Sequence, residues 1–129
     1  MRLLRRGLPD RSDHRGLNPG RGLAPLEALD GLLEGARLCA VSVVEFQTGH
    51  RMPLDAIGDR CRARGARFFV DAVQACGMVP VDVRASKIDF LACGSHKWLM
   101  GPEGAGFLFV DESRWGELVP NVAGWLGHL

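Results

Sequence analysis

Residues 66–98 read ARFFVDAVQACGMVPVDVRASKIDFLACGSHKW, and this stretch decides the predicted fold. It holds two short apolar runs, residues 66–71 and 89–93, each with the length and composition of a buried β-strand. Polar side chains stand at or just after the end of each run, Asp71 and Gln74 in the first case and Ser95, His96 and Lys97 in the second. Open α/β sheets place their ligands at the carboxyl ends of such strands. The stretch therefore predicts a sheet with a site at one edge.

Further helices and strands are predicted on both sides of this stretch. Leucines at helical spacing predict a helix over residues 25–33. An apolar, β-branched run predicts a strand over residues 37–46, covered on both faces. A helix is expected from Pro53, a residue that suits the first helical position, to just before Gly65. Residues 106–110 predict an antiparallel strand, with a short helix after it. The alternation predicts an α/β fold, a partial, mainly parallel sheet flanked by helices.

Length and composition allow one domain. The chain has 129 residues, of which 47% are hydrophobic, an ordinary fraction for a packed core. Residues 1–24 are rich in arginine and glycine without hydrophobic periodicity, so we expect a disordered or poorly defined lead-in. Residues 25–129 then form the folded unit.

Charge and cysteine usage exclude several functions. Sixteen basic and fifteen acidic residues give a net charge of +1, which offers no field for nucleic acid or an anionic membrane. The sequence has no apolar run long enough to span a bilayer, and we expect no secretory signal because the basic start is not followed by an apolar stretch. Its four cysteines are scattered without metal-ligand spacing, so we expect reduced thiols, no metal site and a cytoplasmic protein.

Each polar cluster has an ordinary explanation when taken alone. An aspartate at a strand end, such as Asp71, more often caps a turn. A lone lysine, such as Lys97, usually lies on the surface. The glycine-rich residues 101–106 precede a strand instead of a helix, so they form no dinucleotide-binding fingerprint.

Taken in order, the clusters are far more specific. VDAVQ at residues 70–74, DF at 89–90, GSHKW at 94–98 and GPEGAG at 101–106 together resemble the class V aminotransferase family. This family includes cysteine desulfurases, selenocysteine lyases, kynureninases and isopenicillin N epimerase-like proteins. The resemblance covers roughly residues 25–126. It implies part of the large domain of pyridoxal phosphate-dependent transferases, which have the aspartate aminotransferase-like fold.

The resemblance also implies roles for individual residues. Lys97 matches the lysine that holds pyridoxal 5'-phosphate as a Schiff base and then moves a proton at the substrate. Asp71 matches the carboxylate that keeps the pyridine nitrogen protonated, and Gln74 the amide that donates to the phenolic oxygen. His96 matches a histidine near the phosphate and the lysine. Ser95 is a candidate phosphate ligand, although several relatives carry serine one place earlier.

Three polar residues after the first strand, Gln47, Thr48 and His50, lie where the family places groups that face cofactor or substrate. A simple polar turn explains them equally well. We include Thr48 among the predicted cofactor-binding residues.

The resemblance implies a small amino-acid substrate and a homodimeric full-length enzyme. Relatives carry further segments that supply phosphate contacts, a ring stacked on the cofactor and an arginine for the substrate carboxylate. None of these is recognisable here, so we expect a truncated enzyme with the lysine half of the site. The alternative is a non-catalytic remnant that keeps the fold and at most binds the cofactor weakly. The FQTGHRMPLD turn at residues 46–55 and the GSHKW motif lead us to prefer the epimerase- or kynureninase-like branch over the desulfurases.

Overall fold

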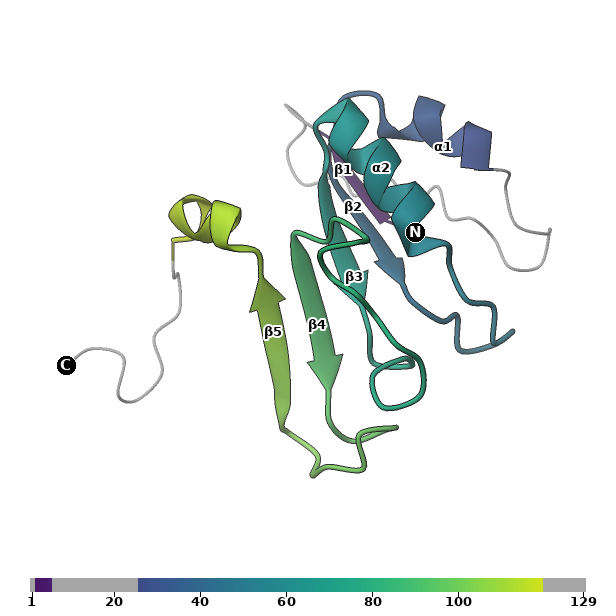
Figure 1. Cartoon of the computed structure of the whole chain (residues 1–129), viewed down its shortest axis with the longest axis vertical. Helices are drawn as coiled ribbons and strands as arrows, with labels where there is room; N and C mark the ends of the chain where they lie inside the picture. Colours follow the sequence, from purple (N-terminus) through teal and green to yellow (C-terminus); the bar gives the residue numbers. More distant parts are fainter. Residues whose placement is uncertain (1, 6–25, 120–129) are drawn as a thin grey trace.

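The computed structural model describes residues 2–5 and 26–119. These residues form one five-stranded sheet in the order β1-β2-β3-β4-β5, with two α-helices and a terminal 3₁₀ helix (Figure 1). The elements are β1 (Arg2–Arg5), α1 (Leu26–Leu33), β2 (Ala36–Ser42), α2 (Leu54–Arg64), β3 (Arg67–Asp71), β4 (Phe90–Gly94), β5 (Gly106–Val110) and η2 (Glu112–Glu117).

The sheet is mixed and its centre is parallel, which confirms the predicted α/β architecture. Strands β2, β3 and β4 run in the same direction, whereas β1 and β5 pair antiparallel at the two edges. The parallel strands are in register, with Val41 opposite Val70 and Val70 opposite Leu91. Their carboxyl ends therefore lie along one edge of the sheet.

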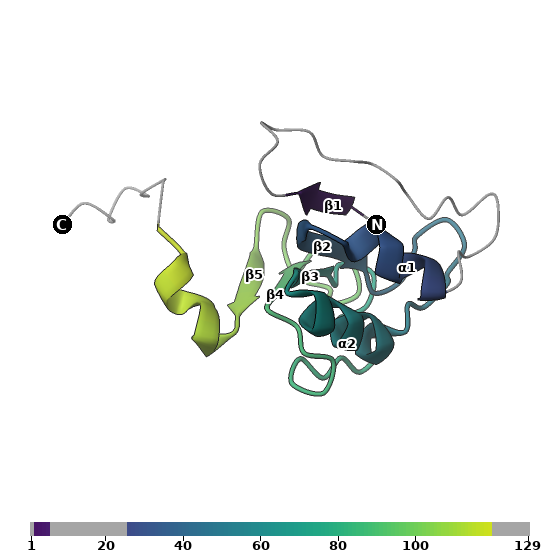
Figure 2. The ribbon, with the colours of Figure 1, turned by 90° about the horizontal axis from the view of Figure 1, so that it is seen from above.

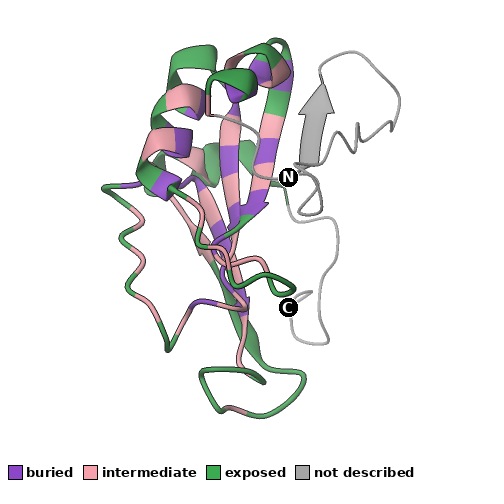
Figure 3. Cartoon of the chain, turned by 90° about the vertical axis from the view of Figure 1, so that its right-hand side faces the viewer, coloured by how far each residue is buried: buried purple, intermediate pink, exposed green. Residues whose placement is uncertain are grey.

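Both α-helices cover the same face of the sheet (Figures 2 and 3). Alternate strand residues point to that face and are buried, among them Cys39, Phe68 and Val70 at 0% exposure. Leu33 of α1 and Ile57 of α2 pack onto them. Burial of each such side chain favours folding by about 1.5–3 kcal/mol, so this layer anchors the sheet.

Several boundaries differ from those expected. The sequence placed no element before Pro25, yet residues 2–5 form β1, while 6–24 lie outside the described residues. Strand β2 ends at Ser42 instead of residue 46, because Val44 bridges back to Arg51 and the chain turns between them. Pro53 is the residue that caps α2, one place before its first turn, and left-handed Gly65 (φ 66°) ends that helix.

Burial on the sheet also departs from the expectation of two covered faces. Among the described residues, the second face of β2, β3 and β4 is only half-buried, at positions such as Ala40, Phe69 and Phe90. The helices of this chain thus account for one buried face.

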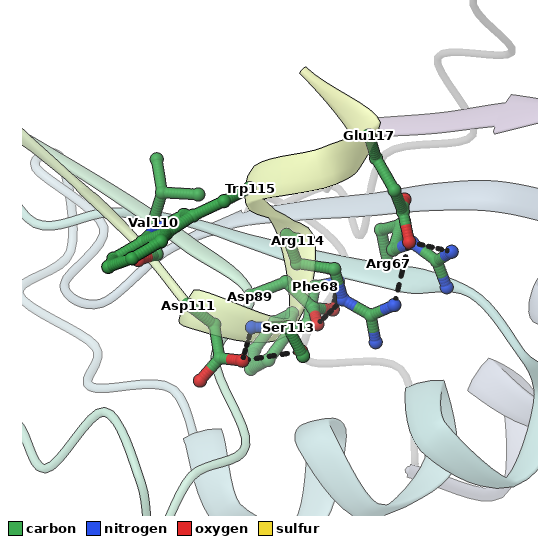
Figure 4. A network of polar contacts seen from close by, with 9 residues as sticks. All are labelled: Arg67, Phe68, Asp89, Val110, Asp111, Ser113, Arg114, Trp115 and Glu117. Atoms are coloured by element: carbon green, nitrogen blue, oxygen red, sulfur yellow. Dashed lines mark hydrogen bonds and ion pairs between the residues drawn. The ribbon is translucent and has the colours of Figure 1, made fainter.

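A polar network ties η2 to the sheet at the edge where β3 and β4 begin (Figure 4). Buried Asp89 accepts hydrogen bonds from the Phe68 amide at 2.7 Å and from Arg114 Nε at 2.7 Å. Glu117 joins Arg114 to Arg67 through two further ion pairs. The network fixes the end of β5 that leads into η2, whereas the candidate site lies at the opposite end of this strand.

In the described part of the chain, no helix is long and apolar enough to cross a membrane.

Candidate active site

Three loops leave the sheet at the carboxyl edge of its parallel strands. They follow Ser42 of β2, Asp71 of β3 and Gly94 of β4. Ser42 lies opposite Asp71, and Asp71 lies opposite Ala92, two residues before the end of β4. The parallel register therefore brings Thr48, the Asp71–Gln74 turn and the Lys97 turn, which the sequence separates by up to fifty positions, to one edge.

Asp71 begins a tight turn. Its Oδ1 accepts the Val73 amide at 2.9 Å, and the Ala72 amide donates to Ala92 O on the neighbouring strand at 2.9 Å. Within residues 26–119, no hydrogen-bond donor contacts the other carboxylate oxygen. Asp71 is half-buried and thus fills the ordinary turn-capping role while one of its carboxylate oxygens keeps no partner among the described residues.

Lys97 lies in a loop that closes on itself after β4. The Gly101 amide donates to Ser95 O and the Met100 amide to Lys97 O, both at 2.9 Å. Met100 adopts the left-handed conformation (φ 52°), which is unfavourable for a residue with a side chain and persists only where the surrounding structure imposes it. The Lys97 side chain is exposed, and within residues 26–119 its amine has no hydrogen bond or ion pair.

Ser95 and His96 are placed differently. The Ser95 hydroxyl lies 2.6 Å from Pro102 O and 3.1 Å from Ala105 O, so its proton is used inside the glycine-rich turn. The His96 ring is exposed and lies against Gly94, where a Cβ atom would approach the ring to 2.9 Å. Gly94, the departure from the family pattern, therefore makes room for the imidazole.

Two contacts join the turn after β3 to the loop after β4. The indole N–H of Trp98 donates to Gln74 Oε1 at 3.1 Å. Gly77 lies so close to the Trp98 carbonyl that a Cβ atom there would be 2.6 Å from the oxygen. The segments that carry Asp71 and Lys97 are thus one packed unit. This link joins residues 24 positions apart and was not predicted from the sequence.

The loop that carries Thr48 is organised by Glu45. The Glu45 carboxylate accepts the Gln47 and Thr48 amides and the Thr48 hydroxyl at 2.8–3.1 Å. These bonds hold the pKa of Glu45 below its ordinary value, and the bond from the Gln47 amide contributes most. The Thr48 hydroxyl also accepts the His50 amide at 3.2 Å. Its contacts are those of the polar turn, and Glu45, which organises them, was not among the residues predicted from the sequence.

The cysteines near the site are protected thiols. Burial raises the pKa of Cys93 to about 11, and the Cys76 thiol and the Asp71 carboxylate add to the rise. A thiol with this pKa stays protonated at neutral pH and is a poor nucleophile. All four cysteines are free.

The groups present fit a pyridoxal phosphate-type cofactor on one side. Asp71 offers an anionic oxygen, Gln74 an amide whose oxygen is already engaged, and Lys97 an exposed amine. Ser95 and Thr48 have their hydroxyl protons committed to bonds within their own loops.

Comparisons with known proteins agree with this arrangement. The chain matches the aminotransferase class-V family over residues 15–124. It is 46% identical over 90 residues to a cysteine desulfurase IscS of Neisseria meningitidis serogroup C, an alignment that covers 69% of this chain and 22% of that protein.

Solved structures show the same fold. The apo structure of a cysteine desulfurase from Thermococcus onnurineus NA1 superimposes with a TM-score of 0.76 and 34% identity, over 81% of this chain and 26% of that one. The cystine C-S lyase C-DES, in complex with its product cysteine persulfide, superimposes with a TM-score of 0.72 and 32% identity, over 78% of this chain and 28% of that one.

The chain spans about a quarter of the length of these relatives. They are desulfurases and a lyase, so they give no support to the preference for the epimerase- or kynureninase-like branch. Members of the family are pyridoxal phosphate enzymes. With the motif order, the fold and the match over residues 15–124 in agreement, the chain belongs to the class V aminotransferase family.

Proposed function

We propose that this chain carries the lysine half of a pyridoxal 5'-phosphate site that acts on a small amino acid, within a partial cofactor-binding large domain formed by residues 25–129. The observation that carries the proposal is the shared edge. Asp71, Gln74 and Lys97 leave the carboxyl ends of adjacent parallel strands, each with a group free to meet a ligand.

Each residue has a chemically defined task in this proposal. The cofactor, when bound, supplies an aldehyde that captures an amine and a pyridine ring that takes up electrons from the substrate. Lys97 supplies that amine and, once released, moves the proton at the substrate α-carbon. The free oxygen of Asp71 holds the proton on the ring nitrogen.

The remaining site residues have supporting tasks. Gln74 donates an amide N–H to the phenolic oxygen. His96 immediately precedes Lys97 and offers an exposed ring for the phosphate side, while Ser95 and Thr48 shape the phosphate and substrate sides of the site through their loops.

The relatives support the proposed substrate class. One solved relative was obtained with cysteine and another with cysteine persulfide, so we propose a small α-amino acid as substrate. We also propose that the full-length enzyme is a homodimer. Large apolar side chains exposed at the same edge support this, among them Phe46 at 73% and Met100 at 91%. Four free thiols suit a reducing compartment, which supports the cytoplasm as location.

The test uses the fact that the chain has only two lysines, Lys87 and Lys97. Lys87 is already ion-paired with Asp59, whereas the Lys97 amine has no partner in the described range. The 129-residue chain is mixed with pyridoxal phosphate, the visible absorbance is recorded, and borohydride then fixes the cofactor for peptide mass spectrometry. We expect a yellow species and an adduct on Lys97.

The matched controls are Lys87→Arg and Lys97→Arg. We expect the first to keep the absorbance and the adduct and the second to lose both. Asp71→Asn should weaken the absorbance without abolishing the adduct. Equal labelling of the two lysines, or no absorbance in the unaltered chain, would reject the proposal in favour of a non-catalytic remnant.

A further inference from the structure

Trp98 is the side chain that joins the two halves of the site, although the proposed chemistry does not use it. It immediately follows Lys97, is 48% exposed and reaches across to the turn after β3. Its indole N–H lies 3.1 Å from Gln74 Oε1. Gly77, in the same turn as Gln74, packs against the Trp98 carbonyl. Side chain and backbone of Trp98 therefore both contact the segment that carries Gln74.

The chemistry of the pair fixes the direction of the amide. An indole N–H is a donor only, so its partner in Gln74 has to be the oxygen. The NH₂ group of Gln74 then points away from Trp98 and is left to donate. A glutamine without this partner can turn its amide by half a rotation and present oxygen or nitrogen with similar ease.

We propose that Trp98 is a positioning residue that holds the Gln74 amide so that only its N–H groups face the ligand, which selects an anionic oxygen there. The inference rests on the proposed function for the identity of that oxygen, the phenolic oxygen of the cofactor. The orientation of the amide stands on the indole contact alone and can be tested without cofactor.

The first experiment therefore uses the cofactor-free chain and follows the indole N–H signals of its tryptophans by ¹H–¹⁵N NMR. Gln74→Leu removes the acceptor, whereas Gln74→Glu keeps an acceptor and removes the donor. A hydrogen bond of ordinary strength predicts roughly 2- to 12-fold faster exchange of the Trp98 indole proton in Gln74→Leu. In Gln74→Glu we expect exchange as slow as in the unaltered chain. Equal exchange in all three chains would overturn the orienting contact.

The second experiment measures the effect on the bound cofactor through the pH midpoint of its visible absorbance. A hydrogen bond donated to the phenolic oxygen favours its ionised form, so losing it raises the midpoint. Trp98→Phe keeps an aromatic ring but removes the indole N–H, so the Gln74 amide is free to turn. This substitution should raise the midpoint by about 0.3 to 1 pH unit. Because Asp71, His96 and Lys97 are the same in every chain compared, the difference reports on the amide alone.

Trp115→Phe is the matched control, because the Trp115 indole also donates one hydrogen bond, to Val110 O at 3.2 Å, at the opposite end of β5. We expect it to leave the midpoint unchanged and Gln74→Leu to raise it at least as far as Trp98→Phe. A midpoint in Trp98→Phe equal to that of Trp115→Phe would overturn the inference. Absence of any absorbance in the unaltered chain would instead reject the proposed function, and the indole exchange would still decide whether Trp98 orients Gln74.

Discussion

Arg114 donates from Nε to Asp89 across 2.7 Å, and this contact fastens the helix after β5 to the amino end of β4. Asp89 is 7% exposed and also accepts the Phe68 amide, so three elements meet at one carboxylate. The interaction raises the pKa of Arg114, with the hydrogen bond to Asp89 as its largest cause. Because β5 runs from the GPEGAG turn to this helix, the contact also anchors the strand that flanks the Lys97 loop.

Replacing Arg114 by methionine should therefore destabilise the chain. The Asp89 carboxylate would stay buried with one partner fewer, which costs about 1–3 kcal/mol. Urea unfolding followed by far-ultraviolet circular dichroism measures the loss. Arg67→Met, which removes the more exposed contact with Glu117, is the control and should cost less. Equal losses in the two variants would contradict the central role of Asp89.

Two helical glycines should respond in opposite ways to alanine. A Cβ atom on Gly58 of α2 would lie 2.0 Å from the Ser86 carbonyl oxygen, whereas Gly31 of α1 has nothing within 4 Å. We expect Gly58→Ala to destabilise by about 1–3 kcal/mol through overpacking. Gly31→Ala should stabilise by about 0.5–1 kcal/mol through helix propensity. Thermal unfolding of both variants tests the pair, and stabilisation by both would refute the close packing of α2 on the segment before β4.

The turn that carries Thr48 should loosen in acid. The pKa of Glu45 is lowered in the folded chain. Its contribution to the stability of the turn is therefore complete above the ordinary pKa of 4.5 and is lost as the pH falls through the lower pKa of the folded chain. The amide signals of Gln47 and Thr48 should shift together over that acidic range, as followed by NMR. Glu45→Gln should show the loosened signals already at neutral pH. A turn that persists unchanged in this variant would exclude the carboxylate as its organiser.

Ser95→Ala tests the internal role of the hydroxyl. Loss of the bond to Pro102 O should lower the free energy of unfolding by about 0.5–1.5 kcal/mol in the absence of cofactor. Ser42→Ala, at an exposed strand end, is the control and should stay within about 0.5 kcal/mol. Unchanged stability of Ser95→Ala in urea unfolding would leave the hydroxyl available for phosphate and contradict the internal role.

Cys93 should resist alkylation. With a pKa of about 11 instead of the ordinary 9.0, its thiolate fraction at pH 8 is roughly 100-fold lower. Iodoacetamide labelling with peptide mass spectrometry should find Cys93 unmodified at pH 8 and labelled increasingly toward pH 11. A urea-unfolded sample, in which the pKa returns to normal, should be labelled readily. Rapid labelling of the folded chain at pH 8 would show an exposed or activated thiol.

Local patterns predicted much of the fold. The strand at residues 106–110 and the helix stop at Gly65 agree with the structure, and the remaining core strands differ mainly at their ends. Apolar runs and helical spacing are properties of neighbouring residues, so they can be recognised in one sequence. The end of β2 was misplaced because Val43 and Val44 look like strand residues, while the turn that bends them away depends on the Glu45 side chain.

The sequence by itself determined the family and the order of the elements. It also predicts Asp71, Gln74 and Lys97 as site residues, because each ends or follows a recognisable strand. Only the tertiary structure decided how they are held. The Trp98–Gln74 and Arg114–Asp89 bonds join residues 24 and 25 positions apart, and both depend on the register of adjacent strands. Such register is set by the packing of the whole buried face against α1 and α2, so no local pattern contains it.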